Sequence, residues 1–367
     1  MPSNRLLRKR LVEESEIFQD LVPSLPAAPL TSPLFTVCPA EIRNRIYTFV
    51  LESEDTSTGD SPSLYRQNAF YYRPGYKQPK RIETALLQTC QQIYAEASLL
   101  PPAVNEHTFW FYRAPPHISN PSSPSQYFRR MTPKQRAHVQ HLHLFTQQYF
   151  LEDRRWSSIW DGIRIGDDGR KLRGECRIAP KKMTITLRHT DWWFWEDNEP
   201  LGIDPFRSGR TRAGEMGTAS NPHNDSSPWG TQFDTFPCLN ELVIEFETVM
   251  RKKDQLDDIV QRALDWKFPL QPEKNLYLVA DAKSKSVYTW VGAEETQLKR
   301  QRPAVSRPRH PGIRPEVPLA QEQEPRPAAP VLRPFDINEP VSHSGLDSNT
   351  ELFYVVFLTW RKQLGQE

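Results

Sequence analysis

The sequence lacks a long apolar run. No stretch of its 367 residues approaches the roughly 18 apolar residues that a membrane-spanning helix needs. The segment from Met1 to Asp20 is polar and charged, without the apolar centre of a secretory signal peptide. We therefore expect an intracellular protein, cytoplasmic or nuclear, that has no membrane partner.

Cysteine is scarce, and its spacing is wide. The four cysteines, Cys38, Cys90, Cys176 and Cys238, lie far apart in the chain. A secreted disulfide scaffold needs a higher cysteine density, and a structural zinc site usually needs paired C-x-x-C spacing. We expect reduced, buried thiols, and we expect no metal ion or other cofactor.

A net charge of either sign is nearly absent. The chain has 47 Lys and Arg against 45 Asp and Glu, which gives a formal net charge of +2. Such a balance creates no global field toward DNA, RNA or an acidic membrane, so it disfavours a nucleic-acid partner. The basic runs Lys299–Arg302 and Arg307–His310 are either nuclear-import signals or solubilising charges.

Sequence motifs that signal catalysis are missing as well. The chain has no Gly-rich phosphate loop, no Gly-x-Ser-x-Gly elbow and no His-Glu-x-x-His helix. We expect that the protein is not an enzyme. Two alternatives stay open: a hydrolase whose site is assembled from distant residues, and a nucleic-acid binder whose basic face the balanced total charge conceals.

Glycine is less frequent than proline, with 15 Gly against 34 Pro. Ten of the prolines fall within residues 299–349, among Arg, Glu and Gln and almost no aromatic residues. Burial in such a segment cannot repay the entropy of ordering, so we expect a disordered internal insertion. The apolar run Leu352–Trp360 follows, and we expect it to pair with Val287–Val291 inside the main sheet.

Apolar spacing predicts an α+β fold, in which helices cover a mixed sheet. The expected helices are Pro39–Leu51, Thr84–Leu100 ending at Pro101 and Pro102, a short helix after Thr132-Pro133, and the helix that Asp254 caps. The expected strands are Leu64–Tyr72, Thr108–Tyr112, His138–Phe145, Met183–His189, Leu242–Phe246, Leu276–Val279, Val287–Val291 and Leu352–Trp360.

The helix Pro39–Leu51 is predicted to be amphipathic. Its apolar residues Ile42, Ile46, Phe49 and Val50 recur at i, i+4, i+7 and i+8. We expect this stripe to face the protein, which leaves the other side of the helix exposed to partners.

Two segments carry a recognisable motif. Cys38-Pro-Ala-Glu-Ile-Arg-Asn-Arg-Ile-Tyr47 is followed by Leu86-Leu-Gln-Thr-Cys-Gln-Gln-Ile-Tyr-Ala-Glu-Ala97 and then by Glu106-His-Thr-Phe-Trp-Phe111. This order resembles a group of filamentous-fungal F-box-like proteins, and the run Asp191–Pro205 is similar to that group as well. The chain departs from the pattern at Cys38, where Leu is usual, and at Gln91, where Arg is usual. A related family with two Glu-x-Arg motifs matches only at Glu41-Ile42-Arg43.

The resemblance implies a protein-interaction module and a role as a substrate receptor for ubiquitination. F-box modules bind a Skp1-type adaptor with a compact helical surface and present a second domain to the target. Glu41, Arg43 and Arg45 are then candidate partner-binding residues. Roughly thirty residues separate the two motif helices, which opposes compact packing, so adaptor binding stays open.

This interpretation divides the chain into five parts. They are a flexible leader (1–36), an F-box-like helical region with one strand (37–112), a mixed α/β region (113–298), the disordered Pro-rich insertion (299–349) and a C-terminal strand that returns to the sheet (350–367). The helical region is expected to pack on the sheet.

An unusual aromatic run provides further partner-binding candidates. In Asp191-Trp192-Trp193-Phe194-Trp195, strand alternation would separate Trp192 and Phe194 from Trp193 and Trp195. We expect one pair in the core and the other on a binding surface, because indole rings are favoured at interfaces. The alternative is that the whole run forms a lid on the core.

Two histidines share one face of a predicted strand. His141 and His143 lie at i and i+2, as in some metal-binding pairs. The alternate residues Leu142 and Leu144 supply an apolar face. We therefore expect both histidines on the wetter side of the sheet, without a metal.

Overall fold

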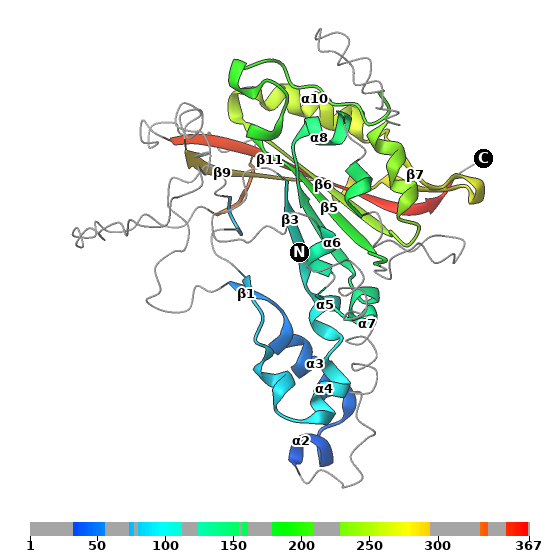
Figure 1. The fold of residues 1–367 in the computed structure, drawn as a ribbon. Coiled ribbons are helices and arrows are strands. Elements are labelled where there is room, and N and C mark those ends of the chain that lie inside the picture. Colours follow the sequence, from blue (N-terminus) through cyan, green and yellow to red (C-terminus); the bar gives the residue numbers. More distant parts are fainter. Residues whose placement is uncertain are drawn as a thin grey trace, which may run out of the picture.

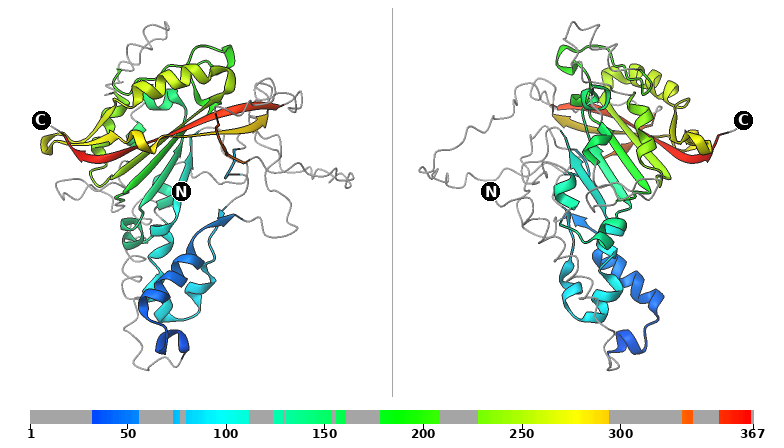
Figure 2. Two further views of the ribbon diagram at one scale, coloured as in Figure 1. Left: turned by 180° about the vertical axis from the view of Figure 1, so that it is seen from behind. Right: turned by 45° about the vertical axis from the view of Figure 1, so that its right-hand side comes forward.

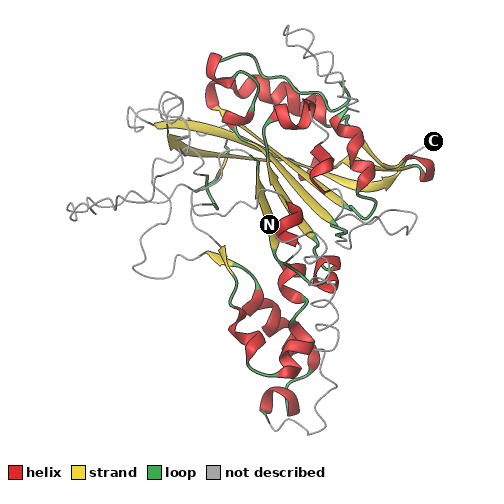
Figure 3. Cartoon of the chain, in the orientation of Figure 1, coloured by secondary structure: helices red, strands yellow, loops and turns green. Residues whose placement is uncertain are grey.

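The computed structural model describes residues 32–55, 73–76, 80–111, 124–128, 130–153, 156–160, 178–207, 228–293, 331–336 and 350–365. In this part of the chain the fold is α+β, as the sequence predicts, and one mixed sheet of nine strands forms its centre. Figure 3 shows the helices on one side of the sheet and at its lower end. No helix among these residues is long and apolar enough to cross a membrane.

Seven strands follow one another across the sheet in the order β10-β9-β11-β6-β5-β4-β3. Strands β3 to β6 run parallel, whereas β11 is antiparallel to β6, β8 and β9. The described strands of the sheet are β3 (Glu106–Trp110), β4 (His141–Phe145), β5 (Lys182–Leu187), β6 (Glu241–Val249), β7 (Lys267–Gln271), β8 (Leu276–Ala280), β9 (Ser286–Ala293), β10 (Arg333–Pro334) and β11 (Thr350–Leu364). A separate short pair joins β1 (Glu54–Asp55) to β2 (Lys80–Arg81).

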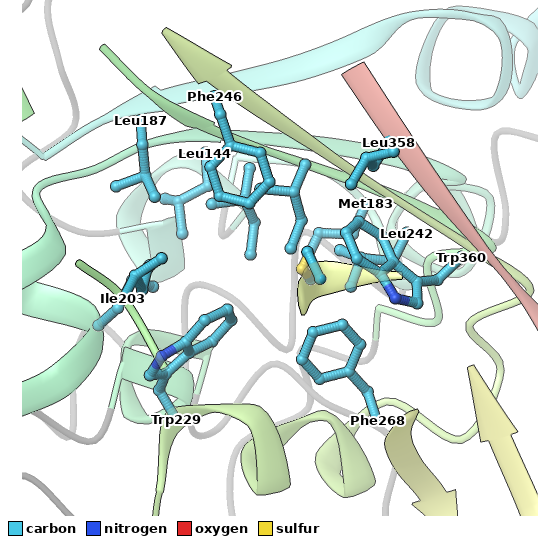
Figure 4. Close-up of a cluster of buried hydrophobic side chains, with 14 of the residues drawn as sticks. Leu144, Met183, Leu187, Ile203, Trp229, Leu242, Phe246, Phe268, Leu358 and Trp360 are labelled. Carbon is cyan, nitrogen blue, oxygen red and sulfur yellow. The ribbon is translucent and has the colours of Figure 1, made fainter. Parts of the chain in front are cut away.

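Strand alternation gives the sheet one apolar face, and this face builds the main core. Leu242, Ile244 and Phe246 of β6 point to the same side as the alternate residues of β4, β5 and β11. Figure 4 shows how Trp229 and Phe268 close this core from below in that view. The covering elements seen in Figure 1 include α8 (Gln148–Asp153) and α10 (Lys253–Ala263).

Helix α10 follows its sequence pattern closely. Its buried residues are Leu256, Ile259, Val260 and Ala263, the predicted apolar stripe. Asp254 lies in the first turn rather than at the cap position, which Lys252 occupies. The carboxylate still stabilises the helix, because its negative charge lies near the positive, N-terminal end of the helix dipole.

The N-terminal motif helices form a unit below the sheet in the views of Figures 1 and 2. Its elements are α2 (Pro33–Thr36), α3 (Ala40–Leu51), η1 (Thr84–Gln88), α4 (Gln91–Ala97) and α5 (Leu100–Val104). Their own small core contains Tyr47, Leu51, Ile93 and Ala97. The predicted leader therefore includes one helix, since Ser32 caps α2 and Pro33 fills its first turn.

Asn105 fastens this unit to the start of β3. Its side-chain amide donates to the carbonyl oxygens of Leu51 and Pro101 at 2.8 and 2.9 Å. Its side-chain oxygen accepts from the backbone N–H of Ser53 at 2.6 Å. One buried side chain therefore joins the end of α3, the start of α5 and the first strand of the main sheet.

Several predicted boundaries are wrong for identifiable reasons. Pro101 and Pro102 lie in the first turn of α5 instead of ending the preceding helix, because proline is tolerated in a first turn.

Cys38 and Cys90 are half-buried and Cys238 is exposed, so the expectation of buried thiols is wrong for these three, all of which are free. Cys176 and the predicted strand Leu64–Tyr72 lie outside the described residues.

The expected pairing of the C-terminal strand is confirmed, because Leu352 opposes Val291 and Val356 opposes Val287. One piece of the predicted disordered insertion is ordered. Within it, Arg333 and Pro334 form β10 and pair with Thr289 and Tyr288 of β9. Phe335 packs edge-on against Tyr354 with ring centroids 5.5 Å apart, and Leu332 also packs against the core, so apolar side chains anchor this piece. Residues 299–330 and 337–349 lie outside the described residues.

The packing predicts a steep contrast between two leucines of β11. Leu358 is fully buried, whereas Leu364 is 72% exposed on the same strand. Leu358→Ala should lower the free energy of unfolding by about 2–5 kcal/mol, because it leaves a cavity in the core. Leu364→Ala should change it by less than about 0.5 kcal/mol. Urea denaturation of both variants measures the difference, and equal effects would contradict this account of the core.

Candidate partner-binding surfaces

The first candidate surface is an apolar stripe on α3. Ile42, Ile46 and Phe49 are 45%, 42% and 73% exposed, and Val37 just before the helix is exposed as well. The prediction that this stripe faces the protein is therefore wrong. Within α3 the buried side chains are instead Tyr47 and Leu51, on a different side of the helix.

Arg43 and Glu96 hold α3 in this orientation. The Arg43 guanidinium donates from Nη2 to Glu96 Oε1 at 2.9 Å and from Nε to Oε2 at 3.1 Å. Tyr47 Oη also donates to Glu96 Oε2, at 3.1 Å. Burial raises the pKa of Glu96, but these bonds and one from Gln92 outweigh it and hold the pKa below its ordinary value. The three motif residues thus form a charged clamp between α3 and α4.

The three candidate partner-binding residues of this helix differ in whether they are free to contact a partner. Arg43 is paired inside the unit, so it offers little to a partner. Glu41 and Arg45 are exposed beside the stripe. We name Val37, Ile42, Ile46 and Phe49, together with Glu41 and Arg45, the α3 surface.

The aromatic run at 192–195 is mostly core. Trp192 and Trp195 are both buried, and Trp192 Nε1 donates to the carbonyl oxygen of Glu247 at 2.8 Å. Trp193 is half-buried, and its Nε1 donates to Glu152 Oε2 at 2.7 Å. Phe194, with φ of 50°, turns the chain, so strand alternation does not apply and the predicted grouping of Trp193 with Trp195 is wrong.

The second candidate site is a buried row of polar side chains on the side of the sheet opposite to the apolar core. It consists of Glu106, His143, Thr186, Glu245 and Glu247, from β3 to β6, and we name it the polar row. His143 lies 2.8 Å from Glu106 Oε1 through Nδ1 and 2.7 Å from Thr186 Oγ1 through Nε2. The Thr186 hydroxyl donates to Glu245 Oε2 at 2.7 Å. The parallel register of these strands brings together residues that are far apart in sequence.

The polar row is covered by residues 73–76. Arg73 Nη1 lies 2.7 Å from Glu245 Oε2, and Arg73 Nε lies 3.4 Å from Glu247 Oε2. Tyr76 Oη lies 2.7 Å from His143 Nδ1 and 3.1 Å from Glu106 Oε1. His143 is therefore buried, which corrects the expectation that it sits on a wet face, while His141 beside it is half-buried.

Burial shifts the ionisation of this row. Burial raises the pKa of Glu106, but the neighbouring His143 and His141 outweigh it and hold the pKa far below its ordinary value. Burial raises the pKa of Glu247 despite the nearby Arg73. Burial also raises the pKa of Tyr76, and the Glu106 carboxylate raises it further. Such shifts gather at functional sites, but they also arise in structural networks.

The carboxylates of the row are covered rather than open to a substrate. Its carboxylates lie on one face, but Arg73 and Tyr76 occupy the space in front of them. Among the described residues, no group of three or more His, Cys, Asp or Glu side chains is placed to hold a metal ion. The cation that faces Glu245 and Glu247 is the guanidinium of Arg73.

The clamp predicts different roles for two arginines of α3. Arg43→Ala should lower the thermal unfolding midpoint, because Glu96 loses its partner and the two helices lose their main polar tie. Arg45→Ala, at an exposed position on the same helix, should leave the midpoint nearly unchanged. Differential scanning calorimetry compares them, and equal losses would refute the clamp.

The pKa of His141 predicts how stability depends on pH. Burial lowers this pKa from 6.5 to about 4. Between these values the unfolded chain binds a proton that the native chain does not, so the free energy of unfolding falls as the pH falls. His141→Asn should flatten this part of the profile, measured by urea denaturation at several pH values across the window. An unchanged slope would show that His141 does not contribute.

Comparisons with known proteins give no relative that would assign a function. The chain matches no family model, no curated protein and no solved structure. Its function must be argued from the α3 surface and the polar row.

Proposed function

We propose that this protein is a non-enzymatic protein-interaction module that binds a protein partner through the α3 surface. The observation that carries the proposal is the exposed stripe of Ile42, Ile46 and Phe49. Large apolar side chains that stand in a row on a folded surface mark an interaction site more often than isolated ones do.

The spacing of the stripe suits a helix that docks into a groove. Anchors at i, i+4 and i+7 lie along one side of α3, a pattern that recurs where a helix presents its apolar side to a partner. Glu41 and Arg45 flank the stripe and supply both signs of charge at its rim. A polar rim around an apolar centre is the usual composition of a specific interface.

The helix is held rigidly behind this surface. The Arg43–Glu96 clamp and the buried Tyr47 fix α3 against α4. A surface that is already ordered loses little conformational entropy when it binds, which favours affinity. The clamp therefore supports partner binding without contacting the partner.

We propose a Skp1-type adaptor as the partner, and a ubiquitination target as the protein presented by the rest of the chain. The support is the resemblance of segments 38–47 and 86–97 to fungal F-box-like proteins. The long segment between the motif helices does not prevent compact packing, because Tyr47, Leu51, Ile93 and Ala97 share one core. Compact packing of the helices supports the proposed adaptor, which F-box modules bind with a compact helical surface.

A binding experiment with purified proteins tests the proposal. Ile46→Glu and Phe49→Glu should each weaken binding to a purified fungal Skp1-type adaptor by about thirtyfold or more, because each places a charge at a position that the partner would bury. Isothermal titration calorimetry measures the dissociation constants. Leu364→Glu is the matched control, since Leu364 is 72% exposed and Phe49 73%.

Two outcomes would count against the proposal in different ways. If the unmodified chain does not bind the adaptor, the adaptor is not the partner. If it binds and the α3 variants bind equally well, the α3 surface is not the interface. Circular dichroism of each variant excludes unfolding as the cause of a loss.

A further inference from the structure

We infer that the polar row is a binding site for the guanidinium group of an arginine-bearing peptide, and that Arg73 of this chain fills the site in the structure. The inference concerns the sheet and does not depend on whether the α3 surface binds an adaptor. It assigns the polar row a ligand class: a short peptide segment that presents an arginine.

Side chains of the neighbouring strands hold the acids of the site in addition to Arg73. Trp290 Nε1 on β9 donates to Glu247 Oε2 at 3.1 Å. Thr186 on β5 donates to Glu245 Oε2 at 2.7 Å, and its oxygen lies 2.7 Å from His143 Nε2. Because these bonds come from the sheet itself, two carboxylates face the same space whichever cation occupies it.

An aromatic floor lies beside these acids. The rings of Trp110 and Phe145 stack with centroids 3.7 Å apart. The Arg73 guanidinium lies 5.8 Å from the centre of the Phe145 ring. Aromatic rings attract organic cations, and a planar guanidinium matches paired carboxylates, so acids and rings together favour arginine over a small inorganic ion.

The occupant is an internal peptide that docks by two side chains. Residues 73–76 make a turn in which the Tyr76 N–H donates to the Arg73 carbonyl at 3.0 Å and Gly75 has φ of +83°. Arg73 is 2% exposed, and the Tyr76 ring packs edge-on against Phe145 at 4.8 Å. The side chains at positions 1 and 4 of Arg73-Pro-Gly-Tyr76 thus act as anchors, as in many bound peptides.

The internal arginine uses the site incompletely. Nη1 of Arg73 lies 2.7 Å from Glu245 Oε2, whereas Nε lies 3.4 Å from Glu247 Oε2, so the guanidinium fits Glu247 less closely than Glu245. An arginine from a separate peptide, free to orient its guanidinium, can direct those N–H groups at Glu245 and Glu247.

The test removes the internal arginine from the full chain and supplies it on a peptide. The probe is a fluorescent peptide with the sequence of residues 70–80, Phe-Tyr-Tyr-Arg-Pro-Gly-Tyr-Lys-Gln-Pro-Lys. Fluorescence anisotropy should show saturable binding to the Arg73→Ala chain. A peptide with citrulline in place of arginine should bind more weakly by about tenfold or more, because it lacks the charge.

A second substitution locates the bound peptide. Glu247→Gln added to the Arg73→Ala chain should weaken binding of the arginine peptide by about tenfold or more, because one of the two carboxylates loses its charge. Leu364→Ala added to the same chain should leave binding unchanged. Binding that persists in the Glu247→Gln chain would place the peptide elsewhere and overturn the inference.

Two further results would overturn it. One is an Arg73→Ala chain that stays folded by circular dichroism and binds neither peptide. If that chain unfolds instead, N-acetyl-arginine amide should restore the folded spectrum and N-acetyl-citrulline amide should not. The second overturning result is that neither compound restores the spectrum, which would show that Arg73 is only a tertiary contact. Ile46→Glu should leave peptide binding unaffected, so this inference and the adaptor proposal fail independently.

Discussion

The structure depends on the opposition between the two faces of one sheet. The same strand, β6, contributes Leu242, Ile244 and Phe246 to the apolar core and Glu245 and Glu247 to the other face. An apolar face buries itself readily, but buried carboxylates must be matched by donors or cations. Thr186, Trp290 and Arg73 supply that match. Among the described residues, Arg73 covers these carboxylates because its charge matches theirs.

Much of the sheet could be predicted from sequence because strand patterning is local. The runs at 183–189, 242–246, 276–279 and 352–360 each overlap a strand of the structure. The stripe of α10 was equally readable, since helical spacing shows which side is apolar. Strand β7 was missed because Pro269 interrupts it, and proline is usually a signal against a strand.

The candidate surfaces could not be predicted in the same way. On α3 the spacing identifies an apolar side, but it does not say whether the same chain covers that side. In the polar row each residue alternates correctly on its own strand, yet the contacts of His143 with Thr186 and of Thr186 with Glu245 require the long-range pairing of β4, β5 and β6. Nothing local to Arg73 indicated that its charge would be buried against two of these strands.

The N-terminal motif also changes meaning once its contacts are known. Arg43, Tyr47 and Glu96 are positions that a sequence reader notices, and they bind one another. The residues that face outward, Ile42, Ile46 and Phe49, look like ordinary core residues in the sequence. The residues that make this motif recognisable therefore hold the unit together, whereas its exposed apolar residues lie at other positions of the same helix.

The place of β11 in the sheet has a consequence for biosynthesis. This last strand lies between β6 and β9 and also pairs with β8, although β6 is translated long before it. Until β11 emerges from the ribosome, the hydrogen-bonding edge of β6 has no neighbour on that side, and open edges of this kind invite association with other chains. A nascent chain stalled before residue 350 should thus depend on chaperones far more than the finished protein does.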